Sequence, residues 1–324
     1  MKSPYPYFGG KSSIAPAIWQ RLGNVPNFVD PFFGSGAVLL SRPHAPRIET
    51  VNDLDCHIAN FWRSLRFDPD VVAYHADNPV NENDLHARHI WLVNRKASMQ
   101  EQLEGDPDWF DAKAAGWWVW GISCWIGGGF CSGNGPWRSV DGKFVQTDSP
   151  GGVKRQRPHL GDAGKGVNRQ RPHLGDAGKG DSLRGYLYAL RDRMENVRVA
   201  CGDWTRVCGP YVTDKHGLTG IVLDPPYAHS ERAGDIYAED HNIAADVRQW
   251  AVENGDNPLL RIALCGYSDE HDSHMPRTWE RLPWKTKGGY TGQASRAQTN
   301  RRREMIWFSP ACLRPSLNLF SDAA

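Results

Sequence analysis

The chain has 324 residues, 40% of them hydrophobic, a formal net charge of +1 and a pI near 7.7. This length suits one large domain or a core that carries a second, inserted domain. The balanced charge excludes a uniformly basic protein, so nucleic-acid binding would depend on local clusters. The seven scattered cysteines lack C-x-x-C pairs and zinc-like His spacing, which predicts a reduced compartment and no metal site. Because no apolar run reaches about 18 residues and the N-terminus has no apolar segment, we expect a soluble, cytoplasmic protein.

The first third of the chain alternates between helical and strand patterns. The expected elements are a helix with Ser12 or Ser13 as its N-cap, a buried strand, a helix start after a Gly-rich turn, a second strand and a further helix, over residues 12–22, 27–29, 37–40, 48–51 and 58–65. Strand, glycine turn, helix and a strand with a terminal acid are typical of a doubly wound α/β sheet, whose ligands bind at the carboxyl ends of the strands.

The alternation stops between about residues 68 and 195, where we predict an insertion. Tryptophans crowd this segment, and the run around residues 117–125 is interpreted as packing rather than as a base-stacking platform. Residues 152–166 return as 166–180 with a single change, from Lys154 to Asn168. Two Gly-rich copies with a period of 14 are too short for a solenoid, so we interpret them as a duplicated loop or ribbon.

Strand patterns resume after the insertion, over residues 197–200, 220–223, 261–264 and 304–308. The sheet is therefore predicted to be assembled from both ends of the chain. The expected organisation is a core of residues 1–67 and 196–324 around an inserted domain of residues 68–195, which contains the duplicated basic loop 152–180.

A glycine turn and an acid mark the ends of the first two predicted strands. Gly34-Ser35-Gly36 lets a ligand approach the backbone closely, although an ordinary tight turn has the same pattern. Leu39 stands where a dinucleotide fingerprint needs its third glycine, which disfavours NAD binding. Asp53, at the end of the next strand, suits a ribose diol or, equally, a helix N-cap.

The most specific motif is Asp224-Pro225-Pro226-Tyr227, which follows an apolar strand. The two prolines fix a rigid turn that cannot continue the pairing of the sheet. A carboxylate and a proline carbonyl can both accept hydrogen bonds from an exocyclic amino group, which aims its lone pair at an electrophilic methyl. The aromatic ring of Tyr227 offers a stacking surface for a base removed from the duplex.

These motifs resemble those of the Dam-type, D12-class N6-adenine DNA methyltransferases, especially the versions found in phages and prophages. The resemblance covers nearly the whole chain and follows the motif order of the alpha group. It rests on Tyr7-Phe8-Gly9-Gly10-Lys11, Asp30-Pro31-Phe32-Phe33-Gly34-Ser35-Gly36, Asn52-Asp53-Leu54-Asp55, Gly202-Asp203-Trp204 and Asp224-Pro225-Pro226-Tyr227. It implies a Rossmann-like, S-adenosylmethionine-dependent methyltransferase sheet with an inserted target-recognition domain.

The resemblance also implies roles for individual residues. Asp224, Pro225, Pro226 and Tyr227 occupy the catalytic positions. The positions that would contact S-adenosylmethionine are Tyr7, Phe8, Gly9, Gly10, Lys11, Asp30, Phe32, Gly34, Ser35, Gly36, Asp53, Asp203 and Trp204. The expected reaction is in-line attack of the N6 of a flipped adenine on the sulfonium methyl, with no metal and no covalent enzyme intermediate. Such an enzyme would belong with restriction-modification or phage methylation systems.

Three other functions fit parts of the pattern. Methylation of cytosine N4 needs a similar site, although Ser rather than Asp then precedes Pro-Pro-Tyr in the resembling family. Methylation of a protein glutamine amide is favoured by Asn at that position. The third alternative is an inactive methyltransferase fold that only binds DNA. Asp224, with motifs present at both the cofactor and the amine site, favours adenine.

Local basic clusters indicate how DNA would be held. Residues 151–180 carry seven Lys or Arg against two Asp, a local charge of +5, which suits phosphate contacts or reading of guanine edges. A solvated loop without a DNA role is the alternative. The candidate DNA-binding residues are Lys154, Arg155, Arg157, Arg169, Arg171, Arg301 and Arg302. The tail with Leu317, Leu319 and Phe320 resembles the pentapeptide with which bacterial DNA enzymes bind the replication sliding clamp, except that Ser316 replaces Gln.

Overall fold

The computed structural model describes residues 1–7, 9–106, 108–125, 130–131, 137–140, 143–146, 183–226, 238–284 and 304–315. The chain divides into two compact units. Unit 1 comprises Met1–Gly10, Gly34–Leu40 and Asn52–Asp203, and unit 2 comprises Lys11–Phe33, Ser41–Val51 and Trp204–Ala324. This division rests on packing alone, and the assignment of residues 68–195 to target recognition stays a prediction.

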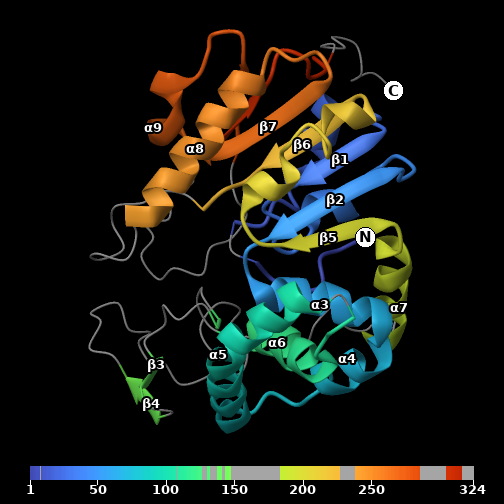
Figure 1. Ribbon diagram of the computed structural model, residues 1–324, viewed down its shortest axis with the longest axis vertical. Helices are drawn as coiled ribbons and strands as arrows, with labels where there is room; N and C mark the ends of the chain where they lie inside the picture. Colours follow the sequence, from blue (N-terminus) through green and yellow to red (C-terminus); the bar gives the residue numbers. More distant parts are fainter. Residues whose placement is uncertain are drawn as a thin grey trace, which may run out of the picture. The chain divides into compact units, whose positions relative to one another are not determined.

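A seven-stranded sheet has the strand order β5-β2-β1-β6-β7-β9-β8 (Figure 1). The strands are β1 (Asn27–Asp30), β2 (Ile48–Asp53), β5 (Val197–Cys201), β6 (Thr219–Leu223), β7 (Leu260–Tyr267), β8 (Glu280–Pro283) and β9 (Glu304–Phe308). β1 is parallel to β2 and β6, β6 is parallel to β7, and β9 is antiparallel to β7 and β8. Because β2 and β6 flank β1, the strand order reverses direction between β1 and β6, which is where sheets of this kind bind ligands.

Unit 2 is built around the middle strands of this sheet. All residues of β1, β6 and β9 are buried, a pattern typical of strands covered on both faces. The helices α1 (Ala15–Leu22) and α8 (Ala238–Asn254) pack against β7, and the short helix α9 (Ser268–His271) follows it. The expected doubly wound α/β sheet is therefore confirmed.

Unit 1 is mainly helical in its described part. It contains α2 (Ala37–Leu40), α3 (Cys56–Phe67), α4 (Pro69–Ala76), α5 (Glu82–Gly105), α6 (Ala112–Cys124) and α7 (Leu183–Met194), with a two-stranded hairpin of β3 (Trp137–Val140) and β4 (Lys143–Gln146). Four helices begin at an Asp or Asn whose side chain accepts a first-turn N–H, which satisfies a donor that the helix leaves unpaired. These N-caps are Asp55, Asp68, Asn81 and Asp111.

Helix α6 is the centre of unit 1 and packs against α3, α4 and α5. A Cβ atom at Gly116 would lie 2.5 Å from the Cβ of His75, so only glycine permits the close approach of α6 to α4. Trp118 and Trp120 are 1% and 0% exposed, and the indole N–H of Trp120 donates to the carbonyl of Asn78 at 2.9 Å. The predicted packing role of this tryptophan run is confirmed for both residues.

Several local expectations differ from the structure. α1 begins after Ile14, which makes no side-chain cap, so neither Ser12 nor Ser13 is the N-cap. The long helix α5 was not anticipated in the insertion, because its apolar positions are too few for a clear helical stripe. β8 was also missed, since a four-residue strand containing Pro283 carries a weak strand signal.

Candidate active site

The carboxyl end of β6 in unit 2 carries an ion pair between two predicted site residues. The ammonium Nζ of Lys11 lies 2.6 Å from a carboxylate oxygen of Asp224. The Lys11 side chain is 4% exposed and that of Asp224 is 21% exposed. Pro225 is buried and Pro226 is exposed, so the turn after β6 fixes Asp224 at the rim of the sheet. The carboxylate therefore reaches solvent while its partner does not.

Lys11 is charged although it is buried. Burial alone would lower the pKa of Lys11, but the negative charge of Asp224, with smaller effects from Cys265 and Glu304, raises the pKa above its ordinary value. The ammonium also lies 5.3 Å from the centroid of the Trp284 ring, within the range of a cation–π contact. The pair thus supplies a fixed positive charge behind the Asp224 carboxylate.

In unit 1, the Gly-rich turn is held by two tyrosines. The hydroxyl of Tyr5 donates to the carbonyl of Gly34 at 2.8 Å, and the rings of Tyr5 and Tyr7 meet edge to face at 6.4 Å. Gly34 has φ 49°, and a Cβ atom there would lie 2.7 Å from the Tyr7 ring. Glycine is therefore required both by the backbone conformation and by the close approach of Tyr7.

The Asp53 carboxylate binds the same turn. Its Oδ2 accepts the N–H of Gly34 at 2.8 Å, and its Oδ1 accepts the N–H of Asp55 at 2.9 Å. Burial raises the pKa of Asp53 to about 7, although these backbone donors oppose the rise. Since Asp55 rather than Asp53 caps α3, the N-cap alternative for Asp53 is wrong. The N–H of Leu54 is a third backbone donor to Asp53, and because a carboxylate offers about four lone-pair sites, the residue can still accept from a ribose hydroxyl.

Four further cofactor candidates lie in two glycine-containing segments of unit 1. Gly10 donates its N–H to the carbonyl of Tyr7 at 3.1 Å, and Gly9 has φ 76°. Ser35 is buried, and the carbonyl of Gly36 accepts the N–H of Leu40 as α2 begins.

Two further candidates pair within unit 2. The rings of Phe32 and Trp204 stack with centroids 6.4 Å apart, and Trp204 also meets Trp250 edge to face. Asp30, at the end of β1, is 4% exposed. Asp203 is an exposed residue of unit 1.

Part of the predicted site lies outside the described residues. This applies to Phe8, Tyr227, Lys154, Arg155, Arg157, Arg169, Arg171, Arg301, Arg302, Leu317, Leu319 and Phe320, and to the duplicated loop 152–180. Their roles stay predictions.

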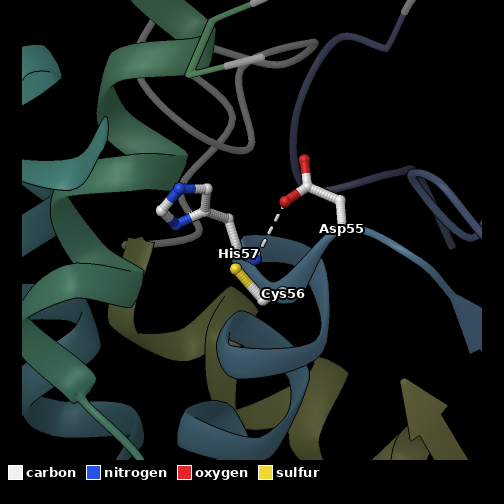
Figure 2. Close-up of side chains that lie close together, drawn as sticks. All are labelled: Asp55, Cys56 and His57. Carbon is white, nitrogen blue, oxygen red and sulfur yellow. Dashed lines mark hydrogen bonds between the residues drawn. The ribbon is translucent and has the colours of Figure 1, made fainter. Parts of the chain in front are cut away.

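A second cluster of polar side chains, Asp55, Cys56 and His57, lies at the start of α3 (Figure 2). One ligand atom from each lies within 4.8 Å of the others. Within the described part of the chain, Asp55 and Cys56 already make hydrogen bonds, whereas neither ring nitrogen of the buried His57 does. The Asp55 carboxylate accepts the N–H of His57, the Cys56 thiol donates to the carbonyl of Lys96, and the His57 ring stacks on Trp118. Burial also raises the pKa of Cys56 to about 12, which disfavours the thiolate that a metal needs.

Sequence reasoning missed one residue beside the Gly34 turn of unit 1 and two residues beside Lys11 in unit 2. Tyr5 fixes the Gly34 turn, and burial raises the pKa of its hydroxyl well above the ordinary value, so it remains a donor. The sequence signal that could have pointed to Tyr5 was its position two residues before Tyr7, which belongs to the predicted cofactor motif. Cys265 and Trp284, near Lys11, gave no signal, because only folding brings β7 and the end of β8 to the N-terminal segment.

The strand order, the glycine turn after β1 and the acidic ends of β2 and β6 define a Rossmann-like methyltransferase fold. Residues 7–103 match the family model of D12 class N6 adenine-specific DNA methyltransferases. Over these residues the chain is similar to this family, and the match indicates an adenine-specific DNA methyltransferase and does not favour cytosine N4 methylation or an inactive fold. The family implies S-adenosylmethionine as methyl donor and DNA as substrate. No curated protein matches the chain. Among the described residues, no helix is long and apolar enough to cross a membrane.

Proposed function

We propose that Asp224 and the carbonyl of Pro225 accept the two N6 hydrogens of an adenine that has been flipped out of DNA. The observation that carries this proposal is the Lys11–Asp224 contact at the carboxyl end of β6, beside the reversal of the strand order. Lys11 holds the Asp224 carboxylate in one position through the contact of its ammonium with one carboxylate oxygen. Hydrogen-bond acceptors on both N6 hydrogens localise the lone pair on nitrogen, which makes the amine a better nucleophile.

Bound S-adenosylmethionine supplies an electrophilic methyl on a sulfonium. Attack of the N6 lone pair on that methyl would form the N–C bond as the S–C bond breaks, S-adenosylhomocysteine would leave, and the excess proton of N6 would pass to water beside the partly exposed Asp224 carboxylate. Asp224 orients the amine for this in-line attack, and Pro225 and Pro226 restrict the motion of the turn that carries it. Most of the acceleration comes from positioning, because effective molarities in well-oriented reactions correspond to about 7 kcal/mol or more.

The cofactor contacts are proposed from the turn geometry of unit 1 and from the aromatic pair of unit 2. Asp53 holds the ribose hydroxyls, and Tyr7 packs over the backbone of Gly34, where no side chain intervenes. Phe32 and Trp204 are proposed to contact the adenine of the cofactor. These assignments are supported by the lone pairs left on Asp53 and by the positive φ of Gly34.

DNA contacts by the duplicated basic loop 152–180 and by Arg301 and Arg302 are proposed from their charge alone. Deleting one repeat is expected to flatten the salt dependence of DNA binding. The tail residues Leu317, Leu319 and Phe320 are proposed as a sliding-clamp motif on sequence similarity. A tail peptide that does not bind purified clamp would dispose of that idea.

The catalytic assignment is tested with Asp224→Ala and with a control at Asp214, a second acid of unit 2 that lies in a short 3-10 helix away from the motif. Transfer of labelled methyl from S-adenosylmethionine to DNA is measured together with DNA binding. We expect Asp224→Ala to abolish transfer while binding remains measurable, and Asp214→Ala to retain both. Turnover by Asp224→Ala at the wild-type rate would refute the role of this carboxylate.

A further inference from the structure

Two tryptophan rings lie side by side on the outer surface of unit 1. Trp91 comes from α5 and Trp117 from α6, and their centroids are 5.2 Å apart with the planes at 74°. Both rings are partly exposed, in contrast to the buried Trp118 and Trp120 of the same helix α6. Burial in the core therefore accounts for Trp118 and Trp120 but not for the partly exposed Trp91 and Trp117.

Cations lie over both rings. The Lys113 ammonium is 4.4 Å from the Trp117 centroid and 5.5 Å from the Trp91 centroid. The Arg95 guanidinium is 4.5 Å from the Trp91 centroid. Trp91, Arg95, Lys113 and Trp117 together are called the cationic face below.

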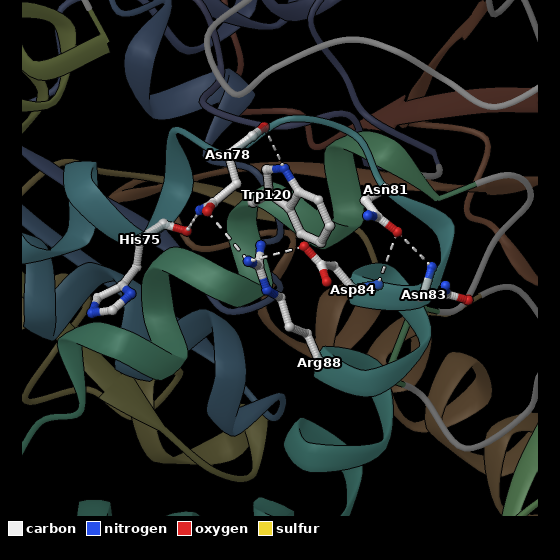
Figure 3. A network of polar contacts seen from close by, with 7 residues as sticks. All are labelled: His75, Asn78, Asn81, Asn83, Asp84, Arg88 and Trp120. Carbon is white, nitrogen blue, oxygen red and sulfur yellow. Dashed lines mark hydrogen bonds and ion pairs between the residues drawn. The ribbon is translucent and has the colours of Figure 1, made fainter.

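A neighbouring arginine, Arg88, is largely buried and serves as a comparison for Arg95 and Lys113. Arg88 lies over the Trp120 ring at 4.3 Å and donates to the side chain of Asn78, and Asp84 is within 3.7 Å of it (Figure 3). The Arg88 side chain is only 14% exposed. Arg88 also lies 5.2 Å from the Trp117 centroid, but its side chain is largely buried, so we leave it out of the cationic face.

In contrast to Arg88, both Arg95 and Lys113 are exposed, and neither has an acidic partner closer than 3.6 Å among the described residues. Arg95 is 47% exposed, and its contact with Asp111 is long at 3.6 Å, while Asp111 is already committed to capping α6 through its other oxygen. Lys113 is exposed, and in the part of the chain that the structure describes no carboxylate lies within 4 Å of it. An exposed pair of this kind contributes little stability.

We propose that the cationic face binds the phosphate backbone of the substrate DNA. This rests on the assignment of DNA as substrate and adds a contact surface on α5 and α6 to it. The two exposed charges lie against the same Trp91 ring, which holds their long side chains in place and lowers the entropy lost on binding. Because cations already cover the rings, the face suits phosphate contacts and not base stacking.

The test replaces Arg95 and Lys113 together by Gln, which removes both charges and keeps a polar side chain with a shorter hydrocarbon stem at each position. The matched control is Arg66→Gln with Lys215→Gln. Each of these cations also lies over a single exposed ring, Phe67 and Tyr211 respectively, and the control removes the same total charge. Binding of labelled duplex DNA is measured by fluorescence anisotropy from 50 to 300 mM salt, with S-adenosylhomocysteine present, and folding is checked by thermal unfolding.

Each phosphate contact contributes about 0.9 to the slope of log affinity against log salt. We expect the slope to decrease by about 1 to 2 in the double variant and to stay unchanged in the control, with at least a roughly tenfold loss of affinity at the lowest salt. If the double variant unfolds, Lys113→Gln alone should still lower the slope by about 1.

An unchanged slope, or an equal decrease in the control, would overturn the proposal. So would a loss of self-association, seen by sedimentation, with DNA affinity unchanged, because the face would then bind a second copy of the chain. Methyl transfer by the wild-type protein is measured in parallel. If the wild-type protein methylates DNA but the salt slope of the double variant is unchanged, only the role of the cationic face is refuted. If the wild-type protein does not methylate DNA, the proposed methyltransferase function is refuted.

Discussion

The Lys11–Asp224 pair allows a quantitative prediction, because its two members differ in burial. Asp224→Asn leaves the ammonium of a side chain that is only 4% exposed, whereas Lys11→Met leaves a carboxylate on a side chain that is 21% exposed and in contact with water. A buried charge that loses its partner costs about 3 to 5 kcal/mol. Glu304 compensates part of this at Lys11, so we expect a loss of about 3 kcal/mol for Asp224→Asn.

Lys11→Met should cost less, about 1 to 2 kcal/mol, because the carboxylate regains water. In the double variant neither member of the Lys11–Asp224 pair is left charged without the other, so its loss should be smaller than the sum of the single losses by about 2 kcal/mol. Urea unfolding of the four proteins measures these values. A larger loss for Lys11→Met than for Asp224→Asn, or additive losses, would refute the burial argument.

Two further predictions concern unit 1. Gly34→Ala should raise the KM for S-adenosylmethionine and lower stability by about 1 to 3 kcal/mol, because φ is 49° and the new methyl would lie 2.7 Å from the Tyr7 ring. Gly105→Ala is its control, since nothing lies within 4 Å of the added Cβ, and an equal loss there would contradict the steric reason. For Asp53, burial raises the folded pKa to about 7, above the unfolded value, so its stabilising effect is complete below about pH 4 and is lost as pH rises through 7. Between about pH 4 and 7 the free energy of unfolding of the wild-type protein, minus that of Asp53→Asn, should fall by up to about 1.4 kcal/mol per pH unit. Urea unfolding at several pH values measures this difference, and a difference that does not change with pH would exclude the raised pKa of Asp53.

The strands of the sheet other than β8 could be predicted from the sequence because they carry strand patterns, and β1, β2 and β6 lead into an Asp at their carboxyl ends. Asp30, Asp53 and Asp224 stand at these ends, and the chemistry of these ends depends on residues adjacent in the chain. The helices of residues 69–124 were less predictable. Their partners are other helices of unit 1, so their apolar positions follow packing such as that of Gly116 against His75 more than any simple period.

The sequence by itself therefore determined the α/β class and the resemblance to D12 class methyltransferases, since each depends on short stretches of contiguous residues. Only the tertiary structure decided which side chains meet. The approach of Lys11 to Asp224, the hydrogen bond of Tyr5 to Gly34 and the contact of Lys113 with the Trp91 ring all join segments that are distant in the chain. Such pairings depend on strand order and helix packing, which arise from the burial of the whole chain and leave no local pattern in its sequence.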